Sequence, residues 1–590
     1  MAASIHYLIK HSFVSILLAL LNTTWAVEWS LENKQKFNDY VKAVMDCRQI
    51  PGLQVSVVQN GRVILTEGYG LRNSETRAPV SATTKFPIGS LTKAFTANIL
   101  AMQLSQKPNL GKYNWDTPIV KIFGDTFQLM DDMRTQNVNI RDLLSHRVGV
   151  PSYFTALLTG FPSTISRKEL VWKLRYMRSV PDSFRSKLIY NNYMYVLAGY
   201  ISEHLANGTS WESLVRNMIF QPLEMTSSTF VDVLDDVEDF AFAHTTLDGV
   251  FELIDNDVAR AVHPAGPAGS IVSNALDIST WMLYQLKHGQ DKEGVPLVSR
   301  EFFDETWKGQ MPEPFSERNI IQPEFPVEDI NVAYDFGWIT SVYRGYRKIW
   351  HSGGISTYSS LLNLFPDKNA GVYGVVNGGG PHKSVGLKMI LNYASDLLLN
   401  QEPWLNQSTA CTFPQPWEPP VPGNTSPVTT PTYRLDLELD NEYNGNYSHP
   451  MFGDISVHST LHQGAVQLKL NFGRFGVFSL SRSADLSNSF KATFSGILSY
   501  LSTSDLKVPP LMLIFKDKNK AGKMTRLEFP VDQMIKTDFI RDFKLNDIMG
   551  NSNAITCPCC TNRASKNAYN GRYFVHMAII FISIHVLALG

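Results

Sequence analysis

Apolar residues recur at helical spacing in the segment that follows residue 90. The residues that recur three or four positions apart are Leu91, Phe95, Ile99 and Met102. Because this period places them on one face, it predicts a buried helix. Pro87 ends the preceding extended segment and Gly89 permits a tight entry. We therefore expect the helix to begin at or just before Ser90.

Shorter apolar runs bounded by glycine or polar residues predict strands. Three such runs lie at 348–350, 357–365 and 370–376. Six more occur later in the chain, at 455–460, 465–470, 476–480, 490–494, 511–515 and 525–528. We expect the later six to form a small antiparallel sheet or barrel.

Proline accumulates between these two regions. Residues 401–432 contain Pro-Gln-Pro, Pro-Pro-Val-Pro and Thr-Thr-Pro, which do not build a helix or a central strand and favour a stiff linker. The sequence thus predicts one domain over 27–400 and a β-rich accessory domain over 433–545. A cysteine-containing tail over 546–573 and a hydrophobic tail over 574–590 follow.

Composition agrees with large packed domains. The chain has 590 residues, of which 44% are hydrophobic and 18% charged, as is usual in globular proteins. The formal net charge of -1 gives no sign of a nucleic-acid partner.

The most informative motif is Ser90-Leu91-Thr92-Lys93 at the start of the predicted helix. A hydroxyl and an amine one turn apart suit a serine nucleophile with a lysine base. The unpaired amides of the first helical turn favour a developing anion, and partial burial would lower the pKa of the lysine. An isolated match is more often a capping serine beside a lysine that extends to water.

Two further clusters bear on this choice. Tyr190 and Asn192 precede a run with helical spacing, so both side chains can project from a loop-to-helix junction. A phenol held near a lysine would lose its proton more easily. His351-Ser352-Gly353-Gly354 follows the predicted strand at 348–350, and alternation places His351 and Gly353 on one face. Taken singly, Tyr190 is typical of a core aromatic residue, Asn192 of a helix cap, and His351 of a buried histidine beside a glycine turn.

The order Ser-x-x-Lys, Tyr-x-Asn and His-x-Gly resembles the serine β-lactamase and penicillin-binding-protein superfamily. The likeness is strongest to class C β-lactamases, D-alanyl-D-alanine carboxypeptidases and eukaryotic β-lactamase-like hydrolases, and it spans roughly residues 30–400. Supporting stretches lie at 140–146, 220–225, 264–270 and 334–338. The resemblance implies an α+β fold: an antiparallel sheet flanked by helices, a helical subdomain, and a small all-β domain behind them.

The resemblance also implies roles for the motif residues. Ser90 would accept the acyl group, Lys93 would take its proton, Tyr190 would relay a proton to the leaving group, and Asn192 would hold the substrate amide. No metal and no cofactor are required by such a mechanism.

The third motif departs from many relatives, in which a lysine stands at the position of His351. A neutral imidazole anchors a substrate carboxylate less well than lysine does, so penicillin or D-alanyl-D-alanine recognition is in doubt. Gly353 and Gly354 let substrate approach the backbone. The amides of Ser90 and Gly354 would then form the oxyanion hole.

The amino-terminal segment predicts export. Residues 1–26 hold a compact apolar run and end in Thr24-Trp25-Ala26, as in a signal peptide. Glycan acceptor triplets begin at Asn207, Asn406, Asn424 and Asn446. We therefore expect a secreted or cell-surface protein.

The carboxy-terminal tail is apolar from Phe574 to Leu589. It is short for a membrane span, and the basic residues that precede it oppose the positive-inside tendency. A removable glycolipid-attachment signal fits best, with a membrane helix or a tail kept in a secreted matrix as alternatives.

The chain has five cysteines. Because the terminal helices of the resembled fold pack side by side, the resemblance implies a disulfide between Cys47 and Cys411. The cluster Cys557, Cys559 and Cys560 then holds at least one thiol that is free, modified or bonded to another chain.

Together these features predict an exported serine hydrolase that acts on a small amide, ester or peptide through a Ser90 acyl-enzyme. The alternative is a secreted matrix component, such as a shell-matrix protein, that keeps the fold without turnover. Matrix or oligomer partners would bind through the β domain and Cys557–Cys560.

Overall fold

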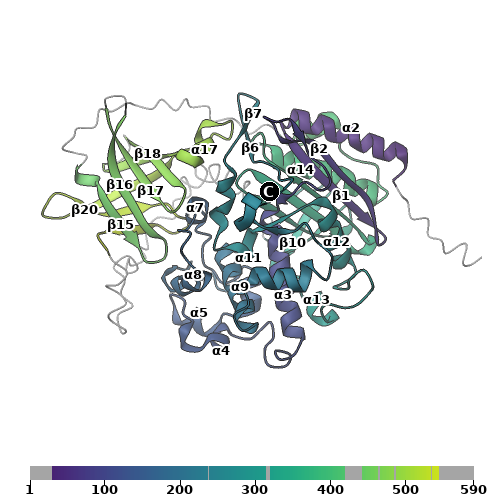
Figure 1. Ribbon diagram of the computed structural model, residues 1–590, viewed down its shortest axis with the longest axis horizontal. Coiled ribbons are helices and arrows are strands. Elements are labelled where there is room, and N and C mark those ends of the chain that lie inside the picture. Colours follow the sequence, from purple (N-terminus) through teal and green to yellow (C-terminus); the bar gives the residue numbers. More distant parts are fainter. Residues whose placement is uncertain are drawn as a thin grey trace, which may run out of the picture.

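The computed structural model describes residues 29–236, 238–313, 319–418, 441–462, 465–483, 487–532 and 534–543. Figure 1 shows two modules, a large one of sheet and helices and a smaller barrel of strands drawn in green and yellow. This is the α+β fold with a trailing all-β domain that the sequence predicts, and that expectation is confirmed.

The large module is built on a nine-stranded antiparallel sheet in the order β3-β2-β1-β14-β13-β12-β11-β10-β9. Its strands are β1 Gly52–Gln59, β2 Arg62–Asn73, β3 Ala78–Pro79, β9 Met311–Pro312, β10 Asp329–Tyr334, β11 Ile339–Tyr343, β12 Tyr346–Ile355, β13 Tyr358–Phe365 and β14 Ala370–Val376. All three strands predicted in this region are present. The first is longer than expected, because the His-x-Gly motif continues β12 rather than following it.

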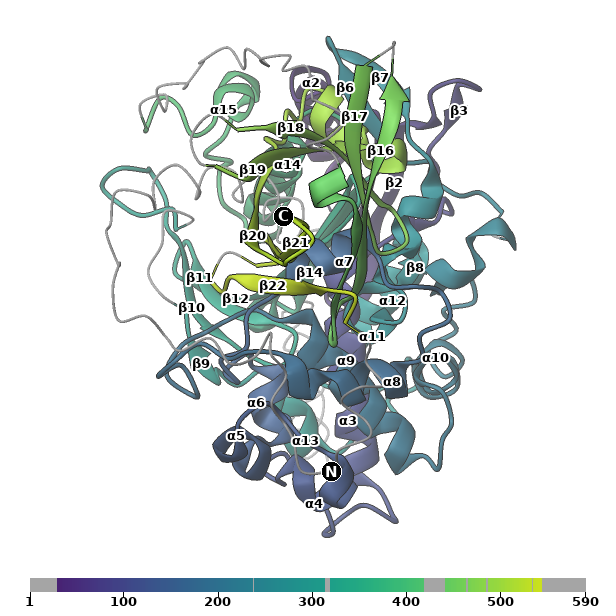
Figure 2. The ribbon, with the colours of Figure 1, turned by 90° about the vertical axis from the view of Figure 1, so that its left-hand side faces the viewer.

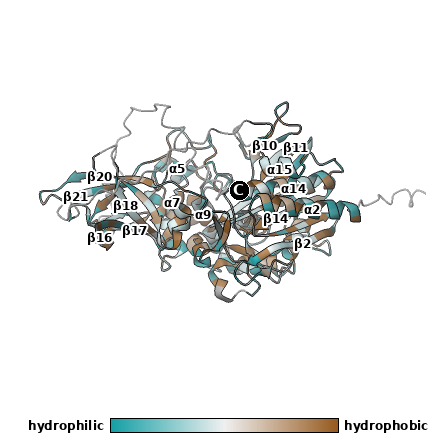
Figure 3. Ribbon diagram, turned by 90° about the horizontal axis from the view of Figure 1, so that it is seen from above, coloured by the Kyte–Doolittle hydropathy of each residue, from teal (hydrophilic) through white to brown (hydrophobic). Residues whose placement is uncertain are grey.

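Helices cover both faces of this sheet. α2 (Leu31–Cys47) and α14 (Lys383–Leu398) pack on one face around a core that includes Val55, Val372 and Leu391. α12 (Ala275–Leu286) packs against β1 and β14 from the other face. Seen from above, α2 and α14 carry both hydrophobic and hydrophilic residues (Figure 3).

A helical subdomain lies below the sheet and barrel in Figure 2. Its central helix, α3 (Thr92–Ser105), is buried at every position from Thr92 to Leu104, so it forms the core of this layer. Further helices of the module are α4 Ile119–Phe123, α5 Asp132–Asn137, α6 Ile140–Leu144, α7 Phe154–Thr159, α8 Arg167–Lys173, α9 Asn192–Leu205, α10 Trp211–Val215, α11 Gly266–Gly269 and α13 Arg300–Glu305. Small sheets are made by β4 Phe86–Pro87, β5 Thr229–Phe230 and β8 Ile271–Ser273, and by β6 His244–Leu247 and β7 Val250–Leu253.

The second module is a closed eight-stranded barrel. Its strands are β15 Gly445–His449, β16 Gly453–His462, β17 Ala465–Phe472, β18 Gly476–Arg482, β19 Ser489–Ser495, β20 Leu511–Lys518, β21 Met524–Phe529 and β22 Thr537–Arg541, with α17 Tyr500–Thr503 between β19 and β20. The six predicted strands are present. The sequence did not reveal β15 and β22, the two strands that pair with each other and close the barrel.

The barrel docks on the large module beside α7. The Asp532 carboxylate accepts hydrogen bonds from the Tyr153 amide at 3.0 Å and the Ser152 hydroxyl at 3.1 Å. Arg474 forms an ion pair with Asp257 at 2.9 Å. These polar contacts fix one end of the barrel against the segment that leads into α7 and against the 3-10 turn Asn256–Val262.

The predicted linker at 401–432 begins too early. Asn406 caps α15 (Gln407–Thr412), and a disulfide joins Cys411 in this helix to Cys47 at the end of α2. Arg48 also donates to the carbonyl of Ala410 at 2.8 Å. The capping box starts a helix within the Pro-rich stretch, and Trp404, Phe413 and Trp417 pack against the core of the large module, so the chain up to residue 418 belongs to that module.

Several sequence predictions lie outside the described residues: the segment 1–26, Asn424, the cluster at Cys557–Cys560 and the apolar tail at 574–590. Among the helices that are described, none has the length and apolar character needed to cross a bilayer.

Candidate active site

Ser90 lies in a 3-10 turn, Gly89–Leu91, that leads directly into α3. The α-helix therefore begins at Thr92, two residues later than the pattern predicts. Gly89 has a φ of +54°, and a Cβ at this position would lie 2.6 Å from the Gly354 nitrogen. Because the two backbones approach so closely, glycine is required here, and Ser90 is held against the part of β12 that continues beyond its pairing with β11.

The amine of Lys93 contacts three oxygen atoms. Its Nζ lies 2.9 Å from Ser90 Oγ, 2.7 Å from Asn192 Oδ1 and 2.8 Å from the Ala268 carbonyl oxygen. Burial lowers the pKa of Lys93 well below its usual value. Burial therefore favours the neutral form of Lys93.

Neutral Lys93 has a defined orientation. The oxygens of Asn192 and Ala268 can only accept, so they take the two N–H bonds of the neutral amine. The remaining lone pair then faces the Ser90 hydroxyl. This is the arrangement that a general base needs to remove the serine proton.

Tyr190 completes the contacts of the nucleophile. Its hydroxyl donates to Ser90 Oγ at 2.9 Å. Burial raises the pKa of Tyr190, and the hydrogen bond to Ser90 offsets only part of this rise. Although Lys93 Nζ lies 4.8 Å from the ring centre, the phenol therefore keeps its proton, contrary to the expectation that it would ionise more easily.

The second motif, Tyr190 to Asn192, lies at the junction between a loop and the start of α9. Asn191 caps the helix, with its Oδ1 accepting from the Tyr193 amide at 2.7 Å. Asn192 is the first helical residue, and its side chain lines the cleft beside Ser90. The capping role thus belongs to Asn191 and leaves Asn192 available to the site.

His351 is buried on β12, where its ring lies beside those of Tyr190 and Tyr334. Its Nε2 lies 3.0 Å from the Tyr334 hydroxyl, and its Nδ1 lies 2.5 Å from the Ser352 carbonyl oxygen. Burial lowers the pKa of His351 to about 3, so the ring is neutral. It donates from Nδ1 to the carbonyl and accepts the phenol proton at Nε2. Both nitrogens are thus occupied by protein, which makes His351 a positioning residue rather than a group that touches substrate.

Two glycines follow His351 on the same strand. A Cβ at Gly353 would lie 2.1 Å from the Ile88 carbonyl oxygen, so only glycine lets β12 run beside the nucleophile turn. The Ser360 hydroxyl donates to that same carbonyl at 2.7 Å. Gly354 lies next to Gly89 and lines the cleft together with Ser90.

Sequence reasoning missed His146. Its buried ring lies 4.2 Å from Tyr190, 4.7 Å from Tyr334 and 5.3 Å from Tyr195 between ring centres, and its Nδ1 accepts from the Asn191 amide at 3.1 Å. Burial lowers its pKa well below the usual value. The residue ends the 140–146 stretch that supports the resemblance, and this was its only signal in the sequence.

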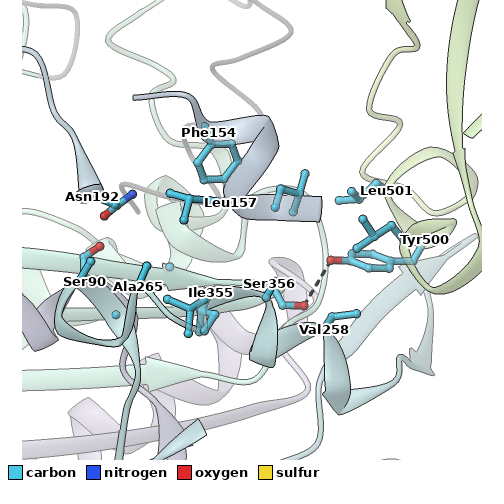
Figure 4. A pocket seen from close by; sticks show the side chains of 17 residues that line it. Ser90, Phe154, Leu157, Asn192, Val258, Ala265, Ile355, Ser356, Tyr500 and Leu501 are labelled. Carbon is cyan, nitrogen blue, oxygen red and sulfur yellow. Dashed lines mark hydrogen bonds between the residues drawn. The ribbon is translucent and has the colours of Figure 1, made fainter. Parts of the chain in front are cut away.

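An apolar cleft extends from Ser90 toward the barrel (Figure 4). Phe154 and Leu157 of α7 form one wall and Ile355 of β12 faces them. The far end is closed by side chains of the barrel, where the Tyr500 hydroxyl lies 3.3 Å from Ser356 Oγ. Among the described residues that line this cleft, none carries a charged side chain.

The remaining predicted sites lie on the surface or in the disulfide. Asn207, Asn406 and Asn446 are exposed, and Cys47 and Cys411 are bonded. Within the described part of the chain, no group of three or more histidine, cysteine, aspartate or glutamate side chains is arranged to hold a metal ion.

Comparison with known proteins agrees with this geometry. The model of the family described as Beta-lactamase matches residues 37–391. The chain is 28% identical over 446 residues to "Unguisins hydrolase ungD'" of Aspergillus campestris, covering 72% of this chain and 77% of that protein. It is 22% identical over 346 residues to "Protein flp" of Staphylococcus aureus, covering 59% of this chain and 63% of that protein. The fold also resembles the octameric penicillin-binding protein homologue from Pyrococcus abyssi, with a TM-score of 0.53 and 21% identity over 86% of this chain and all of the other.

Proposed function

This chain belongs to the beta-lactamase family and is a serine hydrolase of the β-lactamase and penicillin-binding-protein type, and from that premise we propose that it cleaves small neutral amides or esters through an acyl-enzyme on Ser90. The observation that carries the proposal is the contact of 2.9 Å between Lys93 Nζ and Ser90 Oγ, made while Nζ also contacts two oxygens that can only accept.

Acylation follows from these contacts. As Ser90 Oγ forms a bond to the substrate carbonyl carbon, its proton passes to Lys93 Nζ. The backbone amides of Ser90 and Gly354 are the donors for the oxygen that becomes negative. Tyr190, 2.9 Å from Ser90 Oγ, gives its proton to the leaving nitrogen or oxygen and regains one from Lys93.

Deacylation reverses these transfers. A water molecule replaces the leaving group and loses its proton to the Tyr190 and Lys93 pair as its oxygen bonds to the acyl carbon. The bond from the acyl carbon to Ser90 Oγ then breaks, and the serine oxygen regains a proton. The products are a carboxylic acid and the free enzyme.

The lining of the cleft favours neutral apolar substrates. Neutral His351 supplies no cation for a terminal carboxylate, and Phe154, Leu157 and Ile355 suit an apolar acyl group. The related protein named as a hydrolase of unguisins supports hydrolysis as the reaction.

We also propose that the protein works outside the cell. A disulfide persists in oxidising compartments, and Cys47 and Cys411 form one. The exposed asparagines of three glycan acceptor triplets and the apolar segment within residues 1–26 support the same location. We expect the secreted chain to carry extra mass that a glycosidase removes. Variants that replace Asn207, Asn406 and Asn446 should lose this mass. An unglycosylated chain retained in the cytoplasm would contradict the proposal.

A fluorophosphonate probe tests the activity directly. The wild-type protein should be labelled, Ser90→Ala should not, and Ser105→Ala, on the same helix, should behave as wild type. Tyr190→Phe should be labelled while hydrolysing an ester more slowly, since the probe has a better leaving group. Absence of labelling in folded wild type would favour the matrix component without turnover.

A further inference from the structure

A second cavity lies on the opposite face of the sheet from Ser90. It has a volume of about 250 Å³ and is bounded by β12, β13, α14 and the chain around Phe413. Along β12 the side chains alternate: His351 and Gly353 face the catalytic site, whereas Lys348 and Trp350 face this cavity. The cavity is therefore separate from the catalytic cleft.

Its interior carries a buried charge cluster. Lys348 Nζ lies 2.5 Å from one oxygen of Asp329, and Lys388 Nζ lies 3.6 Å from the other. Lys348 and Asp329 are almost completely buried, and one third of the Lys388 side chain is exposed. Two lysines thus share one carboxylate. Glu418 also borders the cavity, but it is exposed and in contact with water.

Amide groups of the lining are left without partners. Among the described residues, Asn319 Nδ2 and Asn392 Nδ2 have no hydrogen-bond acceptor, and Asn363 Oδ1 has no donor. All three side chains are at most 6% exposed. An unpaired buried polar group raises the free energy of the folded state. The two unpaired amide donors lie in a cavity where two lysines share one carboxylate, which indicates that an acceptor group binds there.

The rest of the wall is apolar. Trp350, Phe325 and Phe413 contribute aromatic rings, with Leu361 and Leu387 beside them. Phe325 and Phe413 lie 5.8 Å apart between ring centres. A ligand for this cavity therefore combines an apolar body with an anionic acceptor group.

We propose that this cavity is a binding site for a small apolar carboxylate, such as an aryl-substituted acetic acid. The carboxylate lies between Lys388 and the Asn392 amide, which are one turn apart on α14, and the apolar body lies against Trp350 and Phe413. Because β12 carries Trp350 on one face and His351 on the other, a ligand in the cavity contacts the same strand that borders Ser90.

Titration calorimetry with phenylacetate and its neutral analogue phenylacetamide tests this proposal. The full chain is used with Ser90→Ala, so that binding is measured without turnover and independently of the proposed hydrolysis. Phenylacetate should bind at least about tenfold more tightly than phenylacetamide, because only the acid makes charge-assisted hydrogen bonds. Equal affinities, or no binding of the acid, would overturn the proposal.

Variants locate the binding. Lys388→Met should weaken phenylacetate about tenfold without unfolding the protein, because Asp329 keeps Lys348, and Asn392→Leu should weaken it in the same direction. Lys520→Met, an exposed lysine of the barrel, is the matched control and should change nothing. Wild type labelled at Ser90 by the fluorophosphonate should still bind the acid; loss of binding on labelling would place the acid in the catalytic cleft and refute the second site.

Discussion

The amine of Lys93 lies 2.9 Å from the hydroxyl of Ser90, and its other two contacts are oxygens that can only accept. Replacing Lys93 by methionine keeps the length and burial of the side chain but removes the lone pair. We expect Lys93→Met to lower the acylation rate about 10²- to 10⁴-fold, the usual contribution of a positioned base. Labelling by the fluorophosphonate, quenched at successive times, measures the acylation rate. An unchanged circular dichroism spectrum shows that the fold persists. Wild-type acylation in this variant would remove the base role from Lys93.

The acylation rate should depend on pH through the same amine. Since burial lowers the pKa of Lys93, the neutral form persists to lower pH than in an ordinary lysine, whose pKa is about 10.4. The rate should rise with pH and reach its plateau well before that value. Lys93→Arg keeps the charge at all these pH values and should stay inactive throughout. A wild-type midpoint at or above 10 would contradict the lowered pKa.

The barrel should influence substrate choice through Tyr500. Its ring closes the far end of the cleft, and its hydroxyl lies 3.3 Å from Ser356 Oγ. Tyr500→Ala should raise KM about tenfold for esters with a bulky aromatic acyl group, because burial of such a group contributes roughly 1.5–3 kcal/mol. Acetyl esters, which do not reach that end, should be hydrolysed as before.

Tyr500→Phe separates the two parts of this contact. It keeps the ring and removes the hydroxyl, so the preference for bulky acyl groups should remain. Equal losses on acetyl and aromatic esters in Tyr500→Ala would mean that the barrel acts on the whole site rather than on the acyl end.

Stability should fall in mild acid because of His449. Burial in the barrel lowers its pKa to about 3, with Asp538 opposing and Arg178 supporting the shift. Between pH 6.5 and 3 the unfolded chain binds a proton that the folded barrel excludes, so stability decreases as pH falls through this window. Lowering the pH from 6.5 to 5 should cost about 2 kcal/mol through this residue.

Urea unfolding at both pH values measures this effect. His449→Asn keeps an acceptor for the Met451 amide, which bonds the ring at 3.1 Å, and should reduce the difference between the two pH values. The exposed His204 on α9 is the control, and His204→Asn should leave that difference unchanged. An undiminished pH dependence in His449→Asn would refute the assignment.

Local patterns were enough to predict the elements that carry the site. The run at 370–376 is buried at every residue of β14, and such continuous apolar runs are clear in a sequence. The motif around Ser90 was also evident, because its chemistry lies within four residues. By contrast, β15 contains Gly445, Asn446 and Ser448, and its place in the barrel depends on pairing with β22 nearly a hundred residues later.

Other features depend wholly or partly on distant contacts, which a local pattern does not reveal. His146 enters the site only because Tyr190, Tyr195 and Tyr334 surround it. The raised pKa of Tyr190 follows from desolvation of its hydroxyl in the folded site, which the position of a nearby lysine in the sequence does not reveal. The helix at Gln407–Thr412 forms inside a Pro-rich region because Asn406 caps it and Cys411 is bonded to Cys47.

Leu498, Tyr500 and Leu501 reach the cleft from a domain that contributes none of the groups contacting Ser90. Mutations in the barrel can therefore alter which molecules are accepted while the bond-breaking apparatus stays intact. Selection can act on selectivity and on chemistry in separate stretches of the gene, which gives one ancestral hydrolase a route to many substrates.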